Sequence, residues 1–173
     1  MILIVEGADL VGKSTLADRI AATYGWPVVK IRWALVGDDR AETVGIATAT
    51  IELLRALRPS LILDRCYFSM WAYGQETAYL PELITRFERV SGVTDVRLVL
   101  LTASEEELQR RYTREPDLYF SLATIQAANR RFPSLLPLLP RSVPHLHLDT
   151  TAMSSDAVFT HVAAFVHDSQ LAT

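Results

Sequence analysis

The stretch that decides the fold is ILIVEGADLVGKST, residues 2–15. Its first four residues are apolar and mostly β-branched, and this short run predicts a buried strand. The segment from Gly7 to Ser14 then matches the pattern G-x-x-x-x-G-K-[ST] in full. Glycines let a loop wrap closely around phosphate oxygens, and the amides at a helix N-terminus attract an anion. The stretch therefore predicts a phosphate-binding loop between a strand and a helix.

The chemistry of this loop indicates a nucleoside triphosphate, with Lys13 on the β- and γ-phosphates and the Ser14 hydroxyl on Mg²⁺. The residues expected to bind ATP are Gly7, Asp9, Leu10, Val11, Gly12, Lys13, Ser14 and Thr15. The sequence has neither the Asn/Thr-Lys-x-Asp motif of a GTPase nor the Leu-Ser-Gly-Gly signature of a transport ATPase. A small kinase is then the leading class.

Strand and helix patterns alternate along the rest of the chain. Further apolar runs predict strands at 27–33, 61–63, 96–101 and 145–148. Helical spacing predicts helices at 13–24, 40–57, 68–79, 81–90, from 104 onward, at 119–139 with breaks at Pro133 and Pro137, and at 155–167. Short apolar strands separated by helices imply an α/β fold, a parallel sheet covered on both faces.

Composition sets the class of molecule. The chain has 173 residues, 50% of them apolar, which fits one domain over 1–173. With 17 basic and 20 acidic residues the net charge is −3, which makes nucleic acid an unexpected partner and argues against a membrane surface. No apolar run reaches the roughly 20 residues of a membrane span. The single cysteine, Cys66, excludes an internal disulfide and suggests a cytoplasmic protein.

A second candidate site follows the strand at 61–63, where the chain continues as Asp64-Arg65. An acidic residue at the carboxyl end of a strand beside a phosphate loop can orient Mg²⁺, so Ser14 and Asp64 are the expected metal ligands. An adjacent arginine can clamp a phosphate through two hydrogen bonds. The alternative for such a pair is an ordinary surface ion pair.

These residues carry a family resemblance. The segment DRCYFSMWAY, residues 64–73, resembles the D-R-x-x-x-S-x-x-A-[YF] stretch of thymidylate kinases, and residues 6–15 are similar to their E-G-x-D-x-x-G-K-S-T loop. Related deoxynucleoside kinases carry a similar [ED]-R-S stretch. The resemblance implies the P-loop kinase fold, with a five-stranded parallel sheet in the order 2-3-1-4-5, and a homodimer.

The resemblance also implies roles for residues in an acceptor pocket. Arg65 would hold the acceptor's phosphate, Asp9 would lie near the acceptor's 3′-hydroxyl or the metal, and Tyr73 would pack under a deoxyribose. At the end of the second predicted strand, Lys30 or Arg32 could bind the acceptor phosphate, and Trp33 could stack on a base. The complete set expected to bind the acceptor is Asp9, Arg32, Trp33, Arg65, Phe68, Ser69 and Tyr73. For Phe68, Trp71 and Tyr73 the alternative is a helix face packed on the core, and for Trp71 we favour it.

Arginines cluster again at 110, 111 and 114, where small kinases carry a mobile lid, here expected at about 110–120. Arg110 and Arg114 lie one helical turn apart and share a face, so they are expected to neutralise charge on the transferred phosphoryl group. The expected catalytic set is Lys13, Asp64, Arg65, Arg110 and Arg114. The alternative is a solvated basic face balanced by the glutamates at 105–107.

The sequence thus predicts ATP-dependent, Mg²⁺-assisted transfer of a phosphoryl group to a small nucleotide, by resemblance a deoxynucleoside monophosphate such as dTMP. An acceptor hydroxyl, on a nucleoside or a hydroxylated base, stays an alternative in which Asp64 or Asp9 would act as the base. A regulatory ATPase is a remoter one. Only one helix fits between Trp33 and Leu61, so the family's base-reading residues do not carry over. The loop at 149–151 is expected either on the adenine side or as a helix cap.

Overall fold

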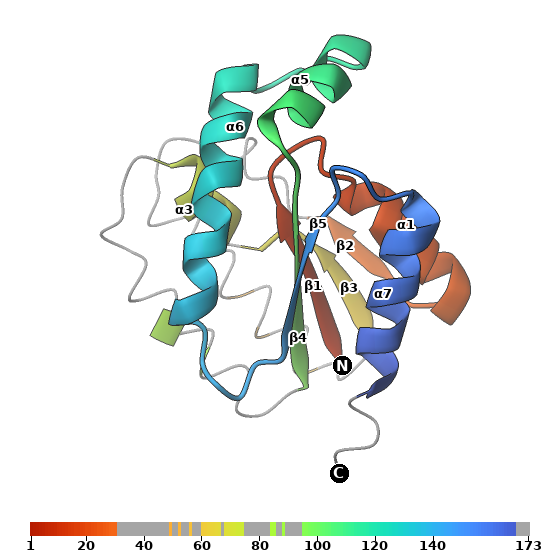
Figure 1. The fold of residues 1–173 in the computed structure, drawn as a ribbon. Coiled ribbons are helices and arrows are strands. Elements are labelled where there is room, and N and C mark those ends of the chain that lie inside the picture. The colour runs from red at the N-terminus through yellow and green to blue at the C-terminus, as the bar shows by residue number, and fades with distance from the viewer. Residues whose placement is uncertain are drawn as a thin grey trace.

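The structure is a computed structural model that describes residues 1–30, 60–66, 68–74 and 95–168, together with positions 49, 52, 56, 84, 85 and 88. Its sheet contains five strands: β1 (Ile2–Gly7), β2 (Val28–Lys30), β3 (Leu61–Asp64), β4 (Val96–Thr102) and β5 (His145–Asp149). Every neighbouring pair is parallel, and the order is β2-β3-β1-β4-β5, which confirms the predicted topology (Figure 1).

Helices cover both faces of this sheet, as predicted (Figure 1). They are α1 (Lys13–Tyr24), α3 (Phe68–Tyr73), α5 (Glu105–Arg114), α6 (Leu122–Arg131) with the 3₁₀ turn η2 (Phe132–Leu138), and α7 (Ser155–Asp168). Helices α1 and α7 pack together on one face, and α3 and α6 pack together on the other. Helix α5 rises above the end of the sheet at which the strands finish, so it lies over the expected site.

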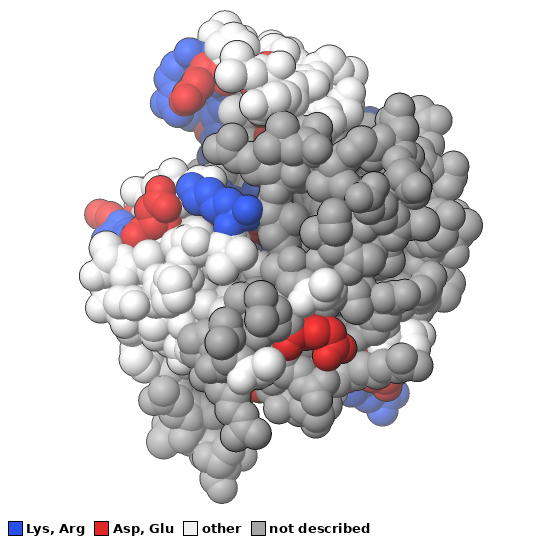
Figure 2. All heavy atoms as spheres, turned by 180° about the vertical axis from the view of Figure 1, so that it is seen from behind, with Lys and Arg blue, Asp and Glu red and all other residues white. Residues whose placement is uncertain are grey.

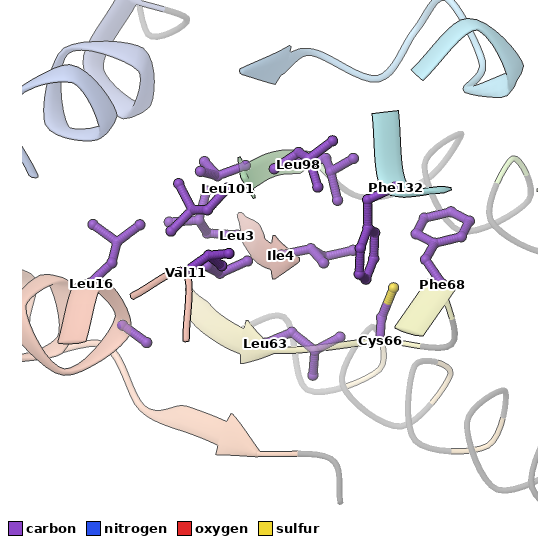
Figure 3. Packing of buried hydrophobic residues seen from close by; sticks show 14 of the residues in the cluster. Leu3, Ile4, Val11, Leu16, Leu63, Cys66, Phe68, Leu98, Leu101 and Phe132 are labelled. Carbon is purple, nitrogen blue, oxygen red and sulfur yellow. The ribbon is translucent and has the colours of Figure 1, made fainter. Parts of the chain in front are cut away.

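The core lies against the three central strands, whose residues are almost all buried. Along β1 the side chains alternate between faces: Leu3 points toward Val11 and Leu16, and Ile4 points toward Phe132 (Figure 3). The edge strands differ from the expectation of double burial, because the residues of β5 alternate between exposed and half-buried. An edge strand has a neighbour on one side only, and here helices cover it incompletely.

Local signals set the helix ends. Gly25 adopts a left-handed φ of 70° and its amide closes α1 onto the Ala21 carbonyl. In the sequence Ser104 is followed by Glu105-Glu106-Glu107, the spacing of a capping box, and in the structure it caps α5 by accepting a hydrogen bond from the Glu107 amide. The Glu107 carboxylate does not complete that capping box, since it binds arginines instead. The predicted helix at 119–139 is α6 followed by the 3₁₀ turn that contains both prolines.

Several predictions fall on residues that are not described. Within the predicted helices at 40–57 and 81–90, the single described positions are helical, and nothing further is described there. Arg32 and Trp33 also lie outside the described residues. Among the helices that are described, none has the length and apolar character needed to cross a membrane.

Candidate functional site

The phosphate loop connects β1 to α1 at the carboxyl edge of the sheet. Gly7 has a φ of +141°, and a Cβ there would lie 2.2 Å from the carbonyl oxygen of Leu101 in β4. Gly12 has a φ of +97°, which L side chains rarely adopt. Leu10 is also left-handed, at 69°, although it has a side chain. The loop therefore takes the close, strained path that the glycine motif predicts.

Lys13 points back into this loop. Its side chain is 5% exposed, donates to the Ala8 carbonyl and lies 3.9 Å from Asp9 Oδ1. Burial and the nearby Arg65 guanidinium lower the pKa of Lys13 to about 8, although surrounding carboxylates act in the opposite direction. The ammonium group is therefore held close to where the motif places phosphates.

The predicted metal ligands meet beside it. Ser14 Oγ donates a 2.9 Å hydrogen bond to Asp64 Oδ2 at the end of β3, and Lys30 Nζ lies 4.0 Å from the same oxygen. Mg²⁺ typically takes one or two protein oxygens and completes its shell with phosphate oxygens and water. A hydroxyl and a carboxylate fit that requirement. Among the residues described, no group of three or more His, Cys, Asp or Glu side chains could hold a metal without such outside ligands.

The predicted acceptor residues gather around Asp9. Arg65 Nη1 donates to Ser69 Oγ at 3.2 Å, and its Nη2 donates to Asp9 Oδ1. The Tyr73 hydroxyl donates to Asp9 Oδ2 at 2.6 Å and accepts from the Asp9 amide at 2.6 Å. The Arg65 guanidinium also lies 5.5 Å from the centre of the Tyr73 ring. The structure thus brings four of the predicted acceptor residues together.

The charges in this cluster are mutually stabilised. Burial raises the pKa of the Asp9 carboxyl, but Lys13, Arg65 and the Tyr73 hydroxyl outweigh it and hold that pKa below its usual value. Burial, followed by the Asp9 charge, raises the pKa of Tyr73 far above its usual range. At neutral pH, Asp9 is therefore a carboxylate and Tyr73 a neutral phenol.

Glu6 supports the cluster from below and was not identified from the sequence as a site residue. It is 1% exposed, and its carboxyl accepts 2.7 Å hydrogen bonds from the Cys66 amide and the Ser69 hydroxyl. Burial raises the pKa of Glu6 above its usual value. Because Ser69 in turn contacts Arg65, Glu6 fixes the turn after β3. The signal that could have identified Glu6 as a site residue is its place in the E-G-x-D segment of the family motif.

The position of Phe68 contradicts the prediction that this side chain contacts the acceptor. Its side chain is fully buried beside Phe132 and Cys66 (Figure 3), so it presents no surface to a ligand in this structure. The packing alternative holds, because Phe68 lies on the face of α3 that turns toward the sheet. Trp71 is likewise in the core, as expected. A different ring reaches the cluster: Phe120, in the loop after α5, lies 4.5 Å from the Tyr73 ring centre.

A cavity of about 680 Å³ opens on the opposite side of the phosphate loop. Its walls come from the loop and the start of α1, from α5 and from the segment after β5. The lining includes Leu10, Val11, Gly12, Thr15, Glu107, Arg110, Arg111, Arg114, Thr150, Thr151, Ala152, Met153, Ser154 and Ser155. This volume suits a nucleoside beside the loop.

Asp149, at the end of β5, accepts hydrogen bonds from the Thr151 amide and hydroxyl, so its side chain shapes the turn at 149–151.

The three arginines of α5 differ in their contacts. Arg110 is 67% exposed and makes two 2.7 Å hydrogen bonds to Glu107, whereas Arg114 is exposed and has no bonded partner among the described residues. Arg111 is 16% exposed and binds Glu107, Leu10 and Thr150. Hydrogen bonds from Arg110 and Arg111 lower the pKa of Glu107 to about 2. The sequence did not single out Arg111, because helical spacing pairs 110 with 114 instead.

Charged side chains mark the same region of the surface. In the view from behind, lysine and arginine side chains with acidic neighbours are seen around α5 and below it, toward the upper end of the molecule (Figure 2). This is the end at which the strands finish in Figure 1. Basic and acidic side chains are therefore interspersed on this part of the surface.

Comparison with known proteins agrees with this architecture. No protein-family model matches the sequence, and no curated protein matches it. Among solved structures, the chain is similar to the YorR protein of Bacillus subtilis in complex with phosphorylated GDP, with 17% identity, a TM-score of 0.76 and 98% of each chain covered. A thymidylate kinase from Candida albicans has 16% identity and a TM-score of 0.65, over 98% of this chain and 92% of its own.

A deoxyadenosine kinase from M. mycoides, with dCMP bound, has 14% identity and a TM-score of 0.62, over 97% of this chain and 99% of its own. These likenesses span nearly the whole of each chain. They show that this chain has the P-loop kinase fold. At such identities they establish the fold and leave the reaction to be argued from the site.

Proposed function

We propose that the protein is an ATP-dependent, Mg²⁺-assisted kinase that phosphorylates a small nucleotide, by preference a deoxynucleoside monophosphate such as dTMP. The observation that carries this proposal is the position of Asp9. Its Oδ1 lies 3.9 Å from Nζ of the donor-side Lys13 and also accepts a hydrogen bond from Arg65, and its Oδ2 accepts one from the Tyr73 hydroxyl. A donor loop and a second pocket with its own arginine therefore share one carboxylate.

On the donor side, catalysis consists of positioning and charge neutralisation. The loop amides and Lys13 would bind the β- and γ-phosphates, and Ser14 and Asp64 would hold Mg²⁺, whose charge offsets that of the phosphates. The adenosine would occupy the cavity between α5 and the segment after β5. Arg110 and Arg114 keep most of their N–H groups unbonded, so they would neutralise the transferred group when the lid closes.

On the acceptor side, Arg65 supports a phosphate ligand. Of its five N–H groups, two bond to Ser69 and Asp9, which leaves others for phosphate oxygens. An acceptor phosphate is already ionised and needs no general base. Because Asp9 holds the Tyr73 hydroxyl, the Tyr73 ring is fixed where the resemblance places a sugar. By the same resemblance, a ring fixed in that position would crowd a 2′-hydroxyl and so favour deoxyribose over ribose.

A hydroxyl acceptor, on a nucleoside or a hydroxylated base, is the second candidate. The observation that favours it is the position of Asp9, a carboxylate that lies 3.9 Å from Lys13 and is deprotonated at neutral pH. Asp64 is less suited to that role, since it is bonded to Ser14 on the metal side. In this case Asp9 would act as the general base, and Arg65 would stabilise its charge.

The two candidates are separated by ADP release from MgATP with a panel of deoxynucleoside monophosphates and nucleosides. We expect a monophosphate to raise the rate above hydrolysis by water, and Arg65→Ala to raise its KM on the order of tenfold or more. Arg141→Ala, which removes an exposed arginine far from the site, is the matched control. Turnover of nucleosides with no turnover of monophosphates favours the hydroxyl acceptor. No stimulation by any acceptor would leave only a regulatory ATPase.

A further inference from the structure

Arg111 is bonded to the protein almost completely. Its Nε donates to Glu107 at 2.7 Å, its Nη1 to the Leu10 carbonyl at 2.8 Å and to Thr150 Oγ1 at 3.2 Å, and its Nη2 to the Thr150 carbonyl at 2.9 Å. These contacts use four of the five N–H groups of a guanidinium. One N–H is left for a ligand, which is too little for an arginine that clamps a phosphoryl group.

The contact with Leu10 fixes a peptide plane of the phosphate loop. Leu10 has a φ of 69°, a left-handed conformation that persists in a residue with a side chain only when its surroundings hold it. The peptide bonds described are all trans, so the Leu10 carbonyl and the Val11 amide point in opposite directions. Since Arg111 holds the carbonyl on the outside of the loop, the Val11 N–H is turned to the inside.

Thr150 does the same one residue further on. Its side chain is buried, and its single hydroxyl proton is shared between the Val11 carbonyl, at 3.2 Å, and the Thr102 carbonyl at the end of β4, at 3.0 Å. Holding the Val11 carbonyl outward turns the Gly12 N–H inward by the same geometry. Within the described part of the chain, neither the Val11 nor the Gly12 amide has a hydrogen-bond acceptor. Both are available to an anion.

We propose that Arg111 and Thr150 form an outer clamp on the phosphate loop, which orients the Val11 and Gly12 amides for phosphate before any nucleotide binds. Arg111 is then a positioning residue and not one of the arginines that touch the transferred group. The clamp joins three segments: α5, the phosphate loop and the turn after β5. It rests on the proposed function in one respect, that the loop binds phosphate.

Inorganic tripolyphosphate is the probe that isolates this effect, because it has phosphates but neither base nor sugar. Binding of tripolyphosphate and of ATP is measured by calorimetry for the wild type and for Arg111→Met. We expect both affinities to fall by a similar factor, on the order of tenfold. Arg111→Lys should not restore them, since one ammonium cannot span the Leu10 and Thr150 oxygens. Thr150→Val should lower the affinity for both ligands, and Thr150→Ser should keep both affinities near those of the wild type.

Arg97→Met is the matched control for a lost arginine. Arg97 also donates to backbone carbonyls, those of Phe165 and Val166, but from the start of β4, at the end of the sheet opposite the phosphate loop. We expect it to change the melting temperature and leave tripolyphosphate affinity unchanged. Should Arg111→Met fail to fold, the Thr150→Val and Thr150→Ser pair carries the test alone.

Two results would overturn the clamp: tripolyphosphate affinity unaltered in both Arg111→Met and Thr150→Val, or full recovery in Arg111→Lys, which would make Arg111 a simple charge. Failure of the proposed function looks different. If the wild type binds neither ATP nor tripolyphosphate, the phosphate site itself is absent. If it binds both but phosphorylates no acceptor, the kinase proposal fails and the clamp stands.

Discussion

Raising the pH should stabilise the nucleotide-free protein through Lys13, and this dependence follows from its burial. The pKa of Lys13 falls from 10.5 to about 8 in the folded chain. Between these two values the unfolded chain keeps a proton on this lysine that the folded chain has lost. The unfolded state therefore binds more protons, and the free energy of unfolding increases with pH across this window.

The magnitude follows from the size of the shift. One pKa unit corresponds to about 1.4 kcal/mol, so a shift from 10.5 to about 8 makes the charged lysine cost the fold on the order of 3 kcal/mol at neutral pH. Between pH ~8 and ~10 about 2 kcal/mol of this should be regained. The Lys13→Met variant lacks the titrating group, so the difference between wild type and variant isolates it.

The assay is urea denaturation of both proteins in parallel at several pH values between ~7 and ~10, without nucleotide. We expect Lys13→Met to be the more stable protein at pH ~7 and to lose that advantage as the pH rises. Bound phosphates favour the protonated lysine, so ATP affinity of the wild type should fall by up to about tenfold per pH unit above pH ~8. A stability difference that stays constant over the whole range would refute this reasoning.

Two further predictions concern the loop and the metal. Gly7→Ala drives a Cβ to 2.2 Å from the Leu101 carbonyl and should cost about 3 kcal/mol or more, whereas Gly12→Ala meets nothing within 4 Å and should cost about 1–2 kcal/mol of backbone strain. Thermal denaturation tests this, and equal losses would contradict the packing of Gly7. Asp64→Asn, and Ser14→Ala beside it, should raise the Mg²⁺ concentration for half-maximal ADP release on the order of tenfold. An unchanged Mg²⁺ dependence would remove the pair from the metal site.

The parts of the fold that were predictable from the sequence depend on local chemistry. Helix α1 begins and ends where the sequence places it, because Lys13 follows a glycine loop and Gly25 supplies the left-handed residue that ends a helix. Ser104 likewise marks the start of α5. The strand order itself came from the family resemblance, since nothing local to a strand names its neighbour.

The site was predictable where a motif or the family resemblance assigns the partners, as for Ser14 with Asp64 and for Asp9 with Arg65, and not where neither does. Helical spacing groups Arg110 with Arg114, but it carries no information that Arg111 meets the phosphate loop and the turn after β5. Phe68 was assigned to the acceptor by the family resemblance, yet its position on α3 turns it into the core. In both cases the position of the side chain depends on contacts with residues that are distant in the sequence.

The central claim is that a phosphoryl group passes from ATP to a nucleotide held by Arg65. The most direct measurement incubates the protein with Mg²⁺, dTMP and ATP labelled on its γ-phosphate, and separates the labelled products. We expect label in dTDP, lost in Lys13→Met and strongly reduced in Arg65→Ala. Label found only in free phosphate, with dTMP and with every other deoxynucleoside monophosphate offered, would contradict it.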